Sequence, residues 1–260
     1  SDVCSSDLGR LADALQARQR FAAQSYSLAR LKRIGEAAGA TVNDVTLAIC
    51  AGALRRYLEV QKALPRKPLI AMVPVSLHDE TDAGGNQVSL LLANLATNLR
   101  DPLKRLQRIV QSTTEAKQRL KAMSRLQKIA HGITSISPMG AGMVMGTSKQ
   151  RPGFNVVISN VPGPKHTLYL NGARLDEVYP VSIATHYLAL NITISGYGDN
   201  LGFGYIACRR SVPALQRMLD YTDESILELE RALADKLTPA TPAPVKRATR
   251  KRVMASRARP

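Results

Sequence analysis

The sequence predicts a mixed α/β (α+β) fold, with a mixed β-sheet flanked by helices in a single domain of about 200 residues. Three observations predict it. Amphipathic helical patterns alternate with short apolar runs that are rich in β-branched residues. Two such runs, 188–197 and 201–208, are joined by Gly198-Asp199-Asn200, which predicts an antiparallel hairpin in the sheet. The composition, 45% hydrophobic and 22% charged over 260 residues, is that of an ordinary globular chain.

Four helices are predicted from apolar side chains that recur every three or four residues. They lie at 26–38, 41–62, 102–123 and 213–233. Gly39 follows the first helix and favours a C-terminal cap, whereas Thr41, Asn43 or Asp44 can cap the second. Asp101-Pro102 opens the longest helix, because proline is favoured at the first helical position. The face of this helix opposite its apolar stripe carries many Lys and Arg residues.

Five strands are predicted from apolar, β-branched runs that are bounded by turn residues. They lie at 69–77, 88–99, 154–159, 188–197 and 201–208. Pro74 falls inside the first strand, and we expect an edge position or a bulge there because proline cannot donate a ladder hydrogen bond. Residues 133–147 are glycine-rich and weakly periodic, which is compatible with a short buried helix or a loop.

The net charge of +16 is concentrated at the C-terminus. Residues 236–260 hold eight Lys and Arg residues, four prolines and no acid, so residues 1–235 carry +8. This composition cannot bury a core, and we expect a disordered basic tail. Such a tail binds nucleic acid or anionic lipid through its charge, or stays solvated without a partner. The rest of the chain has no Trp and no basic patch interleaved with aromatics, so no specific nucleic acid partner is expected.

Several function classes are disfavoured by the residue types present. No apolar run reaches the roughly 18 residues that a membrane-spanning helix needs. Three widely spaced cysteines, Cys4, Cys50 and Cys208, form neither a disulfide framework nor a zinc module, which predicts a reducing compartment. The G-x-S-x-G pattern of serine hydrolases is absent. The sequence therefore predicts no metal site and no serine nucleophile.

Three polar clusters lie at the ends of predicted elements. They are Asn43-Asp44, Gly85-Asn86-Gln87 and Ser159-Asn160-Val161-Pro162-Gly163-Pro164. Taken singly, the first is explained by helix capping, which is worth about 1 kcal/mol. The second is explained by a turn, and the third by a rigid turn that its prolines and glycine impose.

Taken together, these clusters and their neighbours resemble the bacterial wax ester synthase/diacylglycerol acyltransferase family. The matching segments, in the family's order, are 43–48, 52–58, 73–77, 85–89, 101–106 and 159–164. The first of them looks like the helix that carries the family's "ND" motif. The resemblance extends from Phe21 to Arg231. It implies two related halves, like those of chloramphenicol acetyltransferase, with the active site in a tunnel between them.

The resemblance also implies the chemistry. The family transfers a fatty acyl group from acyl-CoA to diacylglycerol or a long-chain alcohol, in triacylglycerol and wax ester synthesis. Acyl-CoA is then a co-substrate, and no cofactor or metal is implied. In the family, a histidine of an H-H-x-x-x-D-G motif deprotonates the acceptor hydroxyl. This chain has no such motif, so it resembles a C-terminal half that lacks the catalytic half.

The missing motif determines which residues we expect to act. His78 precedes Asp82 by four residues, a spacing known from acyltransferases of this fold. However, His78 falls where the family has an ordinary loop, and it has no second histidine beside it. We therefore expect no catalytic residue in this chain and no turnover by the chain alone. The N-terminal acyltransferase half is the expected partner.

The resemblance places Asn43 and Asp44 next to the active-site tunnel. It makes five further residues candidates for the substrate tunnel: Asn86, Gln87, Ser159, Asn160 and Gly163. A wall that faces a missing half should expose apolar side chains, so we expect an apolar patch beside Asn43. The basic face of the helix at 103–123 is a further candidate, for the phosphates of CoA.

The expected organisation has three parts: an unassigned segment at 1–20, an acyltransferase-type domain at 21–235 and the basic tail at 236–260. We expect a cytoplasmic protein that works at a peripheral membrane or lipid-droplet surface. An alternative of a different class stays open, namely a non-catalytic binding module that the basic tail recruits to anionic membrane or nucleic acid.

Overall fold

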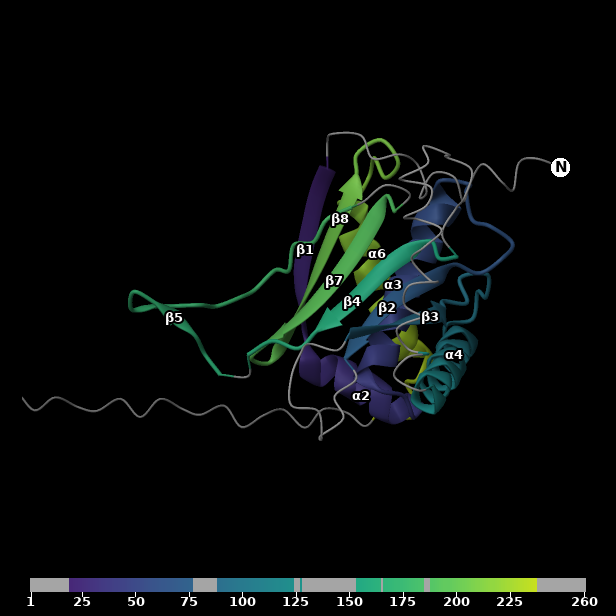
Figure 1. Cartoon of the computed structure of the whole chain (residues 1–260), viewed down its shortest axis with the longest axis horizontal. Helices are drawn as coiled ribbons and strands as arrows, with labels where there is room; N and C mark the ends of the chain where they lie inside the picture. Colours follow the sequence, from purple (N-terminus) through teal and green to yellow (C-terminus); the bar gives the residue numbers. More distant parts are fainter. Residues whose placement is uncertain are drawn as a thin grey trace, which may run out of the picture.

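A computed structural model describes residues 19–76, 88–123, 127, 153–164, 166–184 and 188–237. Its centre is a six-stranded mixed sheet (Figure 1). In sheet order the strands are β1 (Gln19–Ser27), β8 (Asn200–Cys208), β7 (Leu190–Tyr197), β4 (Val156–Val161), β2 (Ile70–Ser76) and β3 (Val88–Asn94). The β2–β4 and β4–β7 pairs are parallel, and the other three pairs are antiparallel. The predicted mixed sheet is confirmed.

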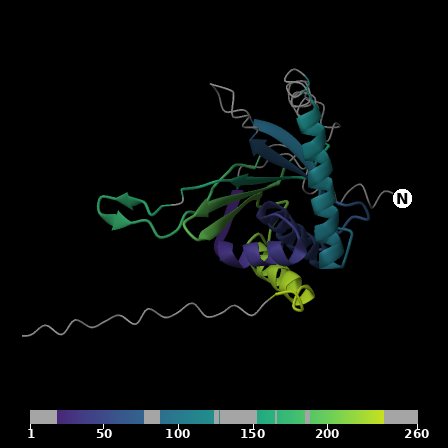
Figure 2. The same ribbon diagram turned by 90° about the horizontal axis from the view of Figure 1, so that it is seen from below.

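Within the described residues, four helices with defined bounds accompany the sheet: α2 (Leu28–Ala38), α3 (Val42–Val60), α4 (Pro102–Ala122) and α6 (Arg217–Ala232). Figure 2 shows α2, α3 and α6 beneath one face of the sheet and α4 standing beside its β3 edge. Helix α3 is buried along most of its length, since it packs against the sheet, α4 and α6. The hydrophobic core therefore lies between the sheet and α3.

Local sequence signals determine where the helices begin and end. Gly39 adopts the left-handed conformation with φ of 64° and caps α2, as predicted, because glycine reaches this region without a Cβ clash. Thr41 and Asp44 form a reciprocal capping box at the start of α3. Asp101 caps α4 by accepting hydrogen bonds from the backbone N–H groups of Leu103 and Lys104.

The structure corrects the predicted bounds of three elements. Strand β1 was not predicted, and Tyr26, the expected start of a helix, belongs to it. Only two side chains of β1 are buried, because it is an edge strand beside β8. The strand expected to reach residue 99 ends at Asn94, and the last helix begins at Arg217 rather than at Pro213.

Pro74 lies neither on an edge strand nor at a bulge, because β2 sits between β4 and β3 and pairs with β3 in continuous register. However, β4 pairs with β2 only at Ala71 and Met72. The sheet tolerates the missing N–H group of Pro74 because the ladder on that side has already ended there.

An arm formed by residues 166–184 projects from the body of the molecule at its β5–β6 tip (Figures 1 and 2), and its return segment runs along β8, where the carbonyl oxygens of Val178 and Pro180 lie against Gly202 and Gly204. It contains the short antiparallel strands β5 (Tyr169–Leu170) and β6 (Ala173–Arg174). The hydroxyl of Tyr197 in β7 ties the two sides of the arm together. It accepts a hydrogen bond from the N–H of Leu168 at 3.0 Å and donates one to the carbonyl of Leu175 at 2.7 Å.

Some predictions fall on residues outside the described ranges. These are the segments at 1–18 and 133–147, His78 with Asp82, Asn86, Gln87, and the tail from residue 238. Within the described ranges, no single helix is long and apolar enough to cross a membrane, while α2 and α3 pass that test only as a pair bent by 98°. The described residues contain no group of three His, Cys, Asp or Glu side chains that could hold a metal ion.

Candidate functional site

A pocket of about 390 Å³ opens where the start of α3, the end of β2, the end of β4 and the last turns of α4 meet. We call it the Asn43 pocket. Its lining residues are Asn43, Pro74, Val75, Lys117, Leu120, Lys121, Asn160 and Pro162. The pocket joins three of the segments that carried the resemblance, which are far apart in the sequence. Parallel pairing of β2 with β4 brings two of them together.

Two asparagine side chains meet on the wall of this pocket. The amide Nδ2 of Asn160 donates a hydrogen bond of 3.4 Å to Oδ1 of Asn43. This contact connects the first turn of α3 to the end of β4. Among the described residues, the amide N–H groups of Asn43 and the carbonyl oxygen of Asn160 have no further hydrogen-bond partner and can bind a ligand. The pair can therefore orient a hydroxyl or carbonyl group.

Asp44 serves a different purpose from its neighbour. Its side chain is buried, and the two carboxylate oxygens are engaged on opposite sides. Oδ2 accepts hydrogen bonds from Oγ1 of Thr41 at 2.5 Å and from the Thr41 N–H at 3.2 Å. Oδ1 accepts one from Oγ1 of Thr113 in α4 at 2.7 Å. Asp44 thus fastens the start of α3 to the middle of α4, and it is a positioning residue rather than part of the pocket lining.

The structure places the remaining described candidates around the end of β4. Ser159 is half-buried and lies opposite Thr193 of β7. Gly163 follows the strand, and a Cβ there would lie 1.7 Å from the carbonyl oxygen of Gly196. Only glycine allows the chain to pass so close to β7. Neither residue lines the Asn43 pocket, but Gly163 determines the path of the loop that places Pro162 in it.

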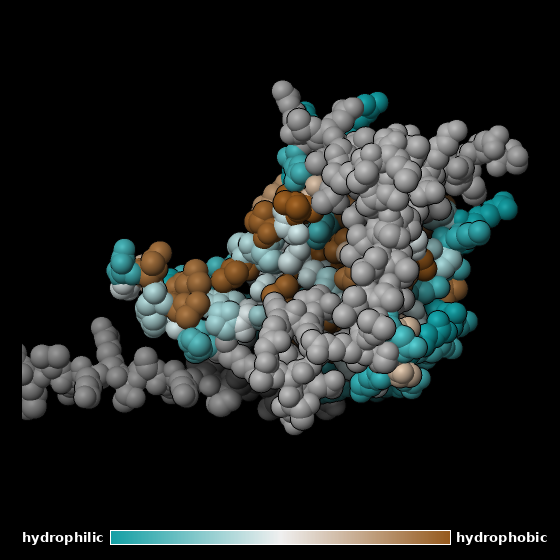
Figure 3. Space-filling view, viewed as in Figure 1, coloured by the Kyte–Doolittle hydropathy of each residue, from teal (hydrophilic) through white to brown (hydrophobic). Residues whose placement is uncertain are grey.

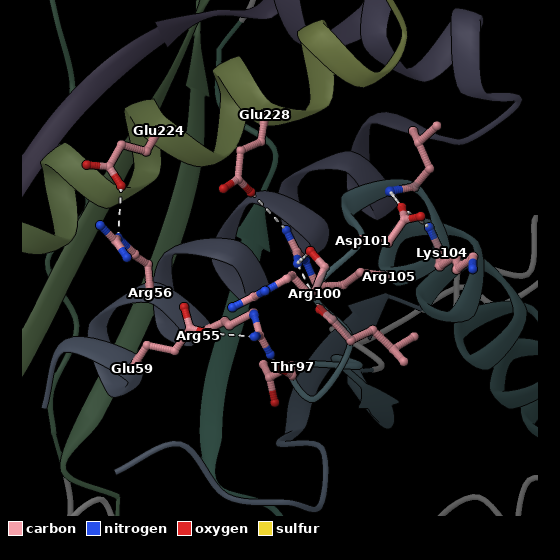
Figure 4. A network of polar contacts seen from close by, with 12 residues as sticks. Arg55, Arg56, Glu59, Thr97, Arg100, Asp101, Lys104, Arg105, Glu224 and Glu228 are labelled. Carbon is pink, nitrogen blue, oxygen red and sulfur yellow. Dashed lines mark hydrogen bonds and ion pairs between the residues drawn. The ribbon is translucent and has the colours of Figure 1, made fainter. Parts of the chain in front are cut away.

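Buried charge anchors the other end of α4 (Figure 4). The Arg105 side chain is 1% exposed and donates to the carbonyls of Leu99 at 3.0 Å and Arg100 at 3.3 Å. It also pairs with Glu228 of α6 at 3.4 Å. Burial lowers the pKa of this guanidinium, an effect that Glu228 opposes. Together with Asp44, Arg105 holds α4 in a defined position, which in turn places the lysines of its last turns.

Sequence reasoning missed the lysines of the pocket. Lys117 and Lys121 lie one turn apart on α4 and both line the Asn43 pocket. The only available signal was the basic face of this helix, which does not distinguish these two lysines from Lys104. No histidine, cysteine or carboxylate occurs among the lining residues that the structure describes. The described lining can therefore bind and orient a substrate, but it offers no general base.

The apolar patch expected beside Asn43 stays a prediction, while the described residues carry a larger group of exposed apolar side chains elsewhere. Among the described residues, large apolar side chains that are substantially exposed gather on the arm (Figure 3). They are Leu168, Tyr169, Leu170, Leu175, Tyr179, Val181 and Ile183. Beside the pocket, the corresponding residue among those described is Val161, which is 47% exposed. Tyr169 and Leu170 lie in the short strand β5 at the tip of the arm, whereas Val181 and Ile183 lie on the return segment that runs along β8.

The sequence comparisons agree on the family that the chain is similar to. A family model for the WS/DGAT C-terminal domain matches residues 84–230. The chain is 45% identical over 216 residues to an O-acyltransferase of Acinetobacter baylyi, covering 83% of this chain and 47% of the relative. It is 50% identical over 218 residues to a probable diacylglycerol O-acyltransferase of Mycobacterium tuberculosis, covering 83% and 48%. The chain thus spans about half the length of the curated relatives it matches.

A solved structure shows the same relation. The wax ester synthase/diacylglycerol acyltransferase from Marinobacter aquaeolei superposes with a TM-score of 0.77 at 41% identity, over 89% of this chain and 56% of that one. This match confirms the prediction that the chain folds as one half of a chloramphenicol acetyltransferase-like protein.

Proposed function

Because the chain belongs to the WS/DGAT family, whose C-terminal domain model it matches over residues 84–230, we propose that it forms one wall of an O-acyltransferase active site. The proposed reaction moves a fatty acyl group from acyl-CoA to the hydroxyl of diacylglycerol or a long-chain alcohol. The observation that carries this proposal is the Asn43 pocket, in which an amide pair meets apolar side chains and two lysines.

The reaction needs a base that the described pocket does not offer. The acceptor hydroxyl oxygen attacks the thioester carbonyl carbon, its proton passes to the base, and the carbon–sulfur bond breaks to release CoA as a thiol. We assign the base to the H-H-x-x-x-D-G motif of an N-terminal half. The amides of Asn43 and Asn160 then orient the acceptor or the thioester carbonyl, since both residues line the pocket and neither amide is saturated by the described residues.

The exposed apolar arm supports a second half. Tyr169, Leu170, Val181 and Ile183 are each between 65% and 76% exposed, and monomeric domains rarely leave so many large apolar side chains in water on one feature. The chain spans about half of its relatives' length, so the partner is of similar size. We propose that the arm packs against it. Apolar substrates further favour a site of action at a membrane or lipid-droplet surface.

The test is reconstitution. Co-expressing this chain with the N-terminal half of the Acinetobacter baylyi relative should give triacylglycerol or wax ester from labelled acyl-CoA, whereas this chain alone should give none. Asn43→Ala should lower kcat/KM about tenfold, the equivalent of one lost hydrogen bond. Asn98→Ala is the matched control, because Asn98 is exposed and outside the pocket. Product formed by the chain alone, or equal effects of the two variants, would contradict the proposal.

A further inference from the structure

The two lysines of the Asn43 pocket have no evident structural purpose. Lys117 is half-buried, Lys121 is exposed, and both line the pocket from the same side of α4. We propose that they form a phosphate-binding subsite at the rim of this pocket, which recognises a phosphate ester carried by the substrate. The inference rests on the proposed function for the identity of the substrate, but the binding it predicts can be measured without turnover.

Charge around the pair supports this assignment. Lysines four residues apart on a helix repel each other by a small amount, and acidic neighbours usually compensate for such repulsion. Here the helical neighbours of Lys117 are Thr113, Thr114, Leu120 and Lys121, none of them acidic. Among the described residues neither lysine has an ion-pair partner, a feature that they share with the other described lysines.

The pocket also keeps carboxylates away from the lysines. The nearest acid in the sequence of α3, Asp44, is committed to Thr41 and Thr113. Glu115 and Arg119 of α4 line a different, smaller cavity of about 200 Å³ between α4 and β3. The ammonium groups therefore share the Asn43 pocket with amides and apolar side chains alone among its described lining. An anionic ligand suits such a site, since it relieves the repulsion between the two cations.

The helix dipole does not account for both lysines. Cations are favoured in the last turn of a helix, and Arg119 and Lys121 occupy the last turn of α4. Lys117 lies one turn earlier and gains little from the dipole, which acts within the last turn. Helical periodicity puts Lys117 and Lys121 on one side of α4, toward the Asn43 pocket, while Arg119 faces the other cavity.

The rest of the pocket limits what the ligand looks like. The same lining contains the apolar side chains of Val75, Leu120 and Pro162 and the amides of Asn43 and Asn160. A volume of about 390 Å³ accommodates part of a small-molecule ligand. The ligand thus combines an anionic phosphate, for the lysines, with a less polar portion, for the apolar side chains of the same pocket. CoA and the headgroup of a phospholipid both meet this description, and phosphate is their shared chemistry.

The experiment uses the 260-residue chain and isothermal titration at low salt. The ligands are CoA, pantetheine, which lacks every phosphate, and phosphatidylcholine vesicles with and without phosphatidylglycerol. The test variant is Lys117→Gln/Lys121→Gln. The matched control is Lys104→Gln/Arg108→Gln, which removes the same charge from exposed positions of α4 outside the pocket. Thermal unfolding of both variants verifies that each remains folded.

We expect the pocket variant to bind a phosphate ligand at least tenfold more weakly, because hydrogen bonds to charged groups are the stronger ones. The control variant should change binding less than twofold, and pantetheine binding should be equal in all three proteins. If the pocket variant loses affinity for CoA, the subsite binds the phosphates of the acyl carrier. If it loses affinity for the anionic vesicles, the subsite binds a lipid headgroup. Equal losses in the two variants, an equal loss for pantetheine, or no measurable binding by the unmodified chain would overturn the inference.

This outcome is separate from that of the proposed reaction. If the reconstituted protein forms no ester but the lysine-dependent binding is present, the proposed function fails and the subsite stands. If the ester is formed at the same rate and with the same KM for acyl-CoA in the pocket variant, the function stands and the subsite fails.

Discussion

Replacing Asp44 with alanine separates the two residues of the Asn43-Asp44 pair. The substitution removes the carboxylate that receives three hydrogen bonds from Thr41 and Thr113. Loss of the capping box costs about 1 kcal/mol. Loss of the buried, charge-assisted bond from Thr113 costs about 2 kcal/mol, and the hydroxyl retains a second acceptor in the carbonyl of Val110 at 3.1 Å. We therefore expect the free energy of unfolding to fall by about 3 kcal/mol.

Asn43→Ala gives the contrasting result. Its side chain makes one long hydrogen bond, 3.4 Å, to Asn160, so we expect a loss of less than about 1 kcal/mol. Urea unfolding followed by far-UV circular dichroism measures both variants, and an unchanged m-value verifies that the same surface unfolds. Adding Thr113→Val to the Asp44→Ala variant should lower the free energy of unfolding little further, since the carboxylate that Thr113 donates to is already removed. A loss below about 1 kcal/mol for Asp44→Ala, or equal losses at the two positions, would refute this division of roles.

Three further predictions follow from close contacts and buried groups. Gly163→Ala should destabilise the domain by more than about 2 kcal/mol, because the added Cβ would lie 1.7 Å from a carbonyl oxygen of β7. Thermal unfolding measures this loss, and Gly153→Ala is the control, because no atom lies within 4 Å of a Cβ at that position. Hydrogen bonding to Arg30 lowers the pKa of Glu230 below its ordinary 4.5, so this pair stabilises the fold at neutral pH and its contribution is lost as the pH falls through the lowered value. Glu230→Gln should flatten that part of the pH–stability curve, and an unchanged curve would contradict the assignment. Burial raises the pKa of Cys50 to about 12, so iodoacetamide at pH 8 should label it only after unfolding.

Local signals were enough to predict most helices and the closing hairpin. Thr41 and Asp44 cap α3, Asp101-Pro102 opens α4, and Gly39 ends α2, all through interactions within four residues of the chain. Such signals act at short range, so they can be recognised without knowing what the helix packs against. They also carried the order of motifs that identified the family.

Edge strand β1 shows what local sequence signals do not predict. Strand β1 buries only Ala22 and Tyr26, so its own pattern is too weak to indicate a strand, and pairing with β8 makes it one. This agrees with the general rule that strand formation depends on packing against neighbouring strands more than on local sequence.

By itself, the sequence determined the class of fold, the family and the absence of the H-H-x-x-x-D-G motif, since these follow from residue types and their order. Only the tertiary structure decided that Asn43 turns toward a pocket while Asp44 turns into the α3–α4 contact. It likewise decided that Lys117, Lys121 and Asn160 share that pocket. The physical reason is that the β2–β4–β7 crossovers and the packing of α4 bring together residues more than seventy positions away from Asn43 along the chain.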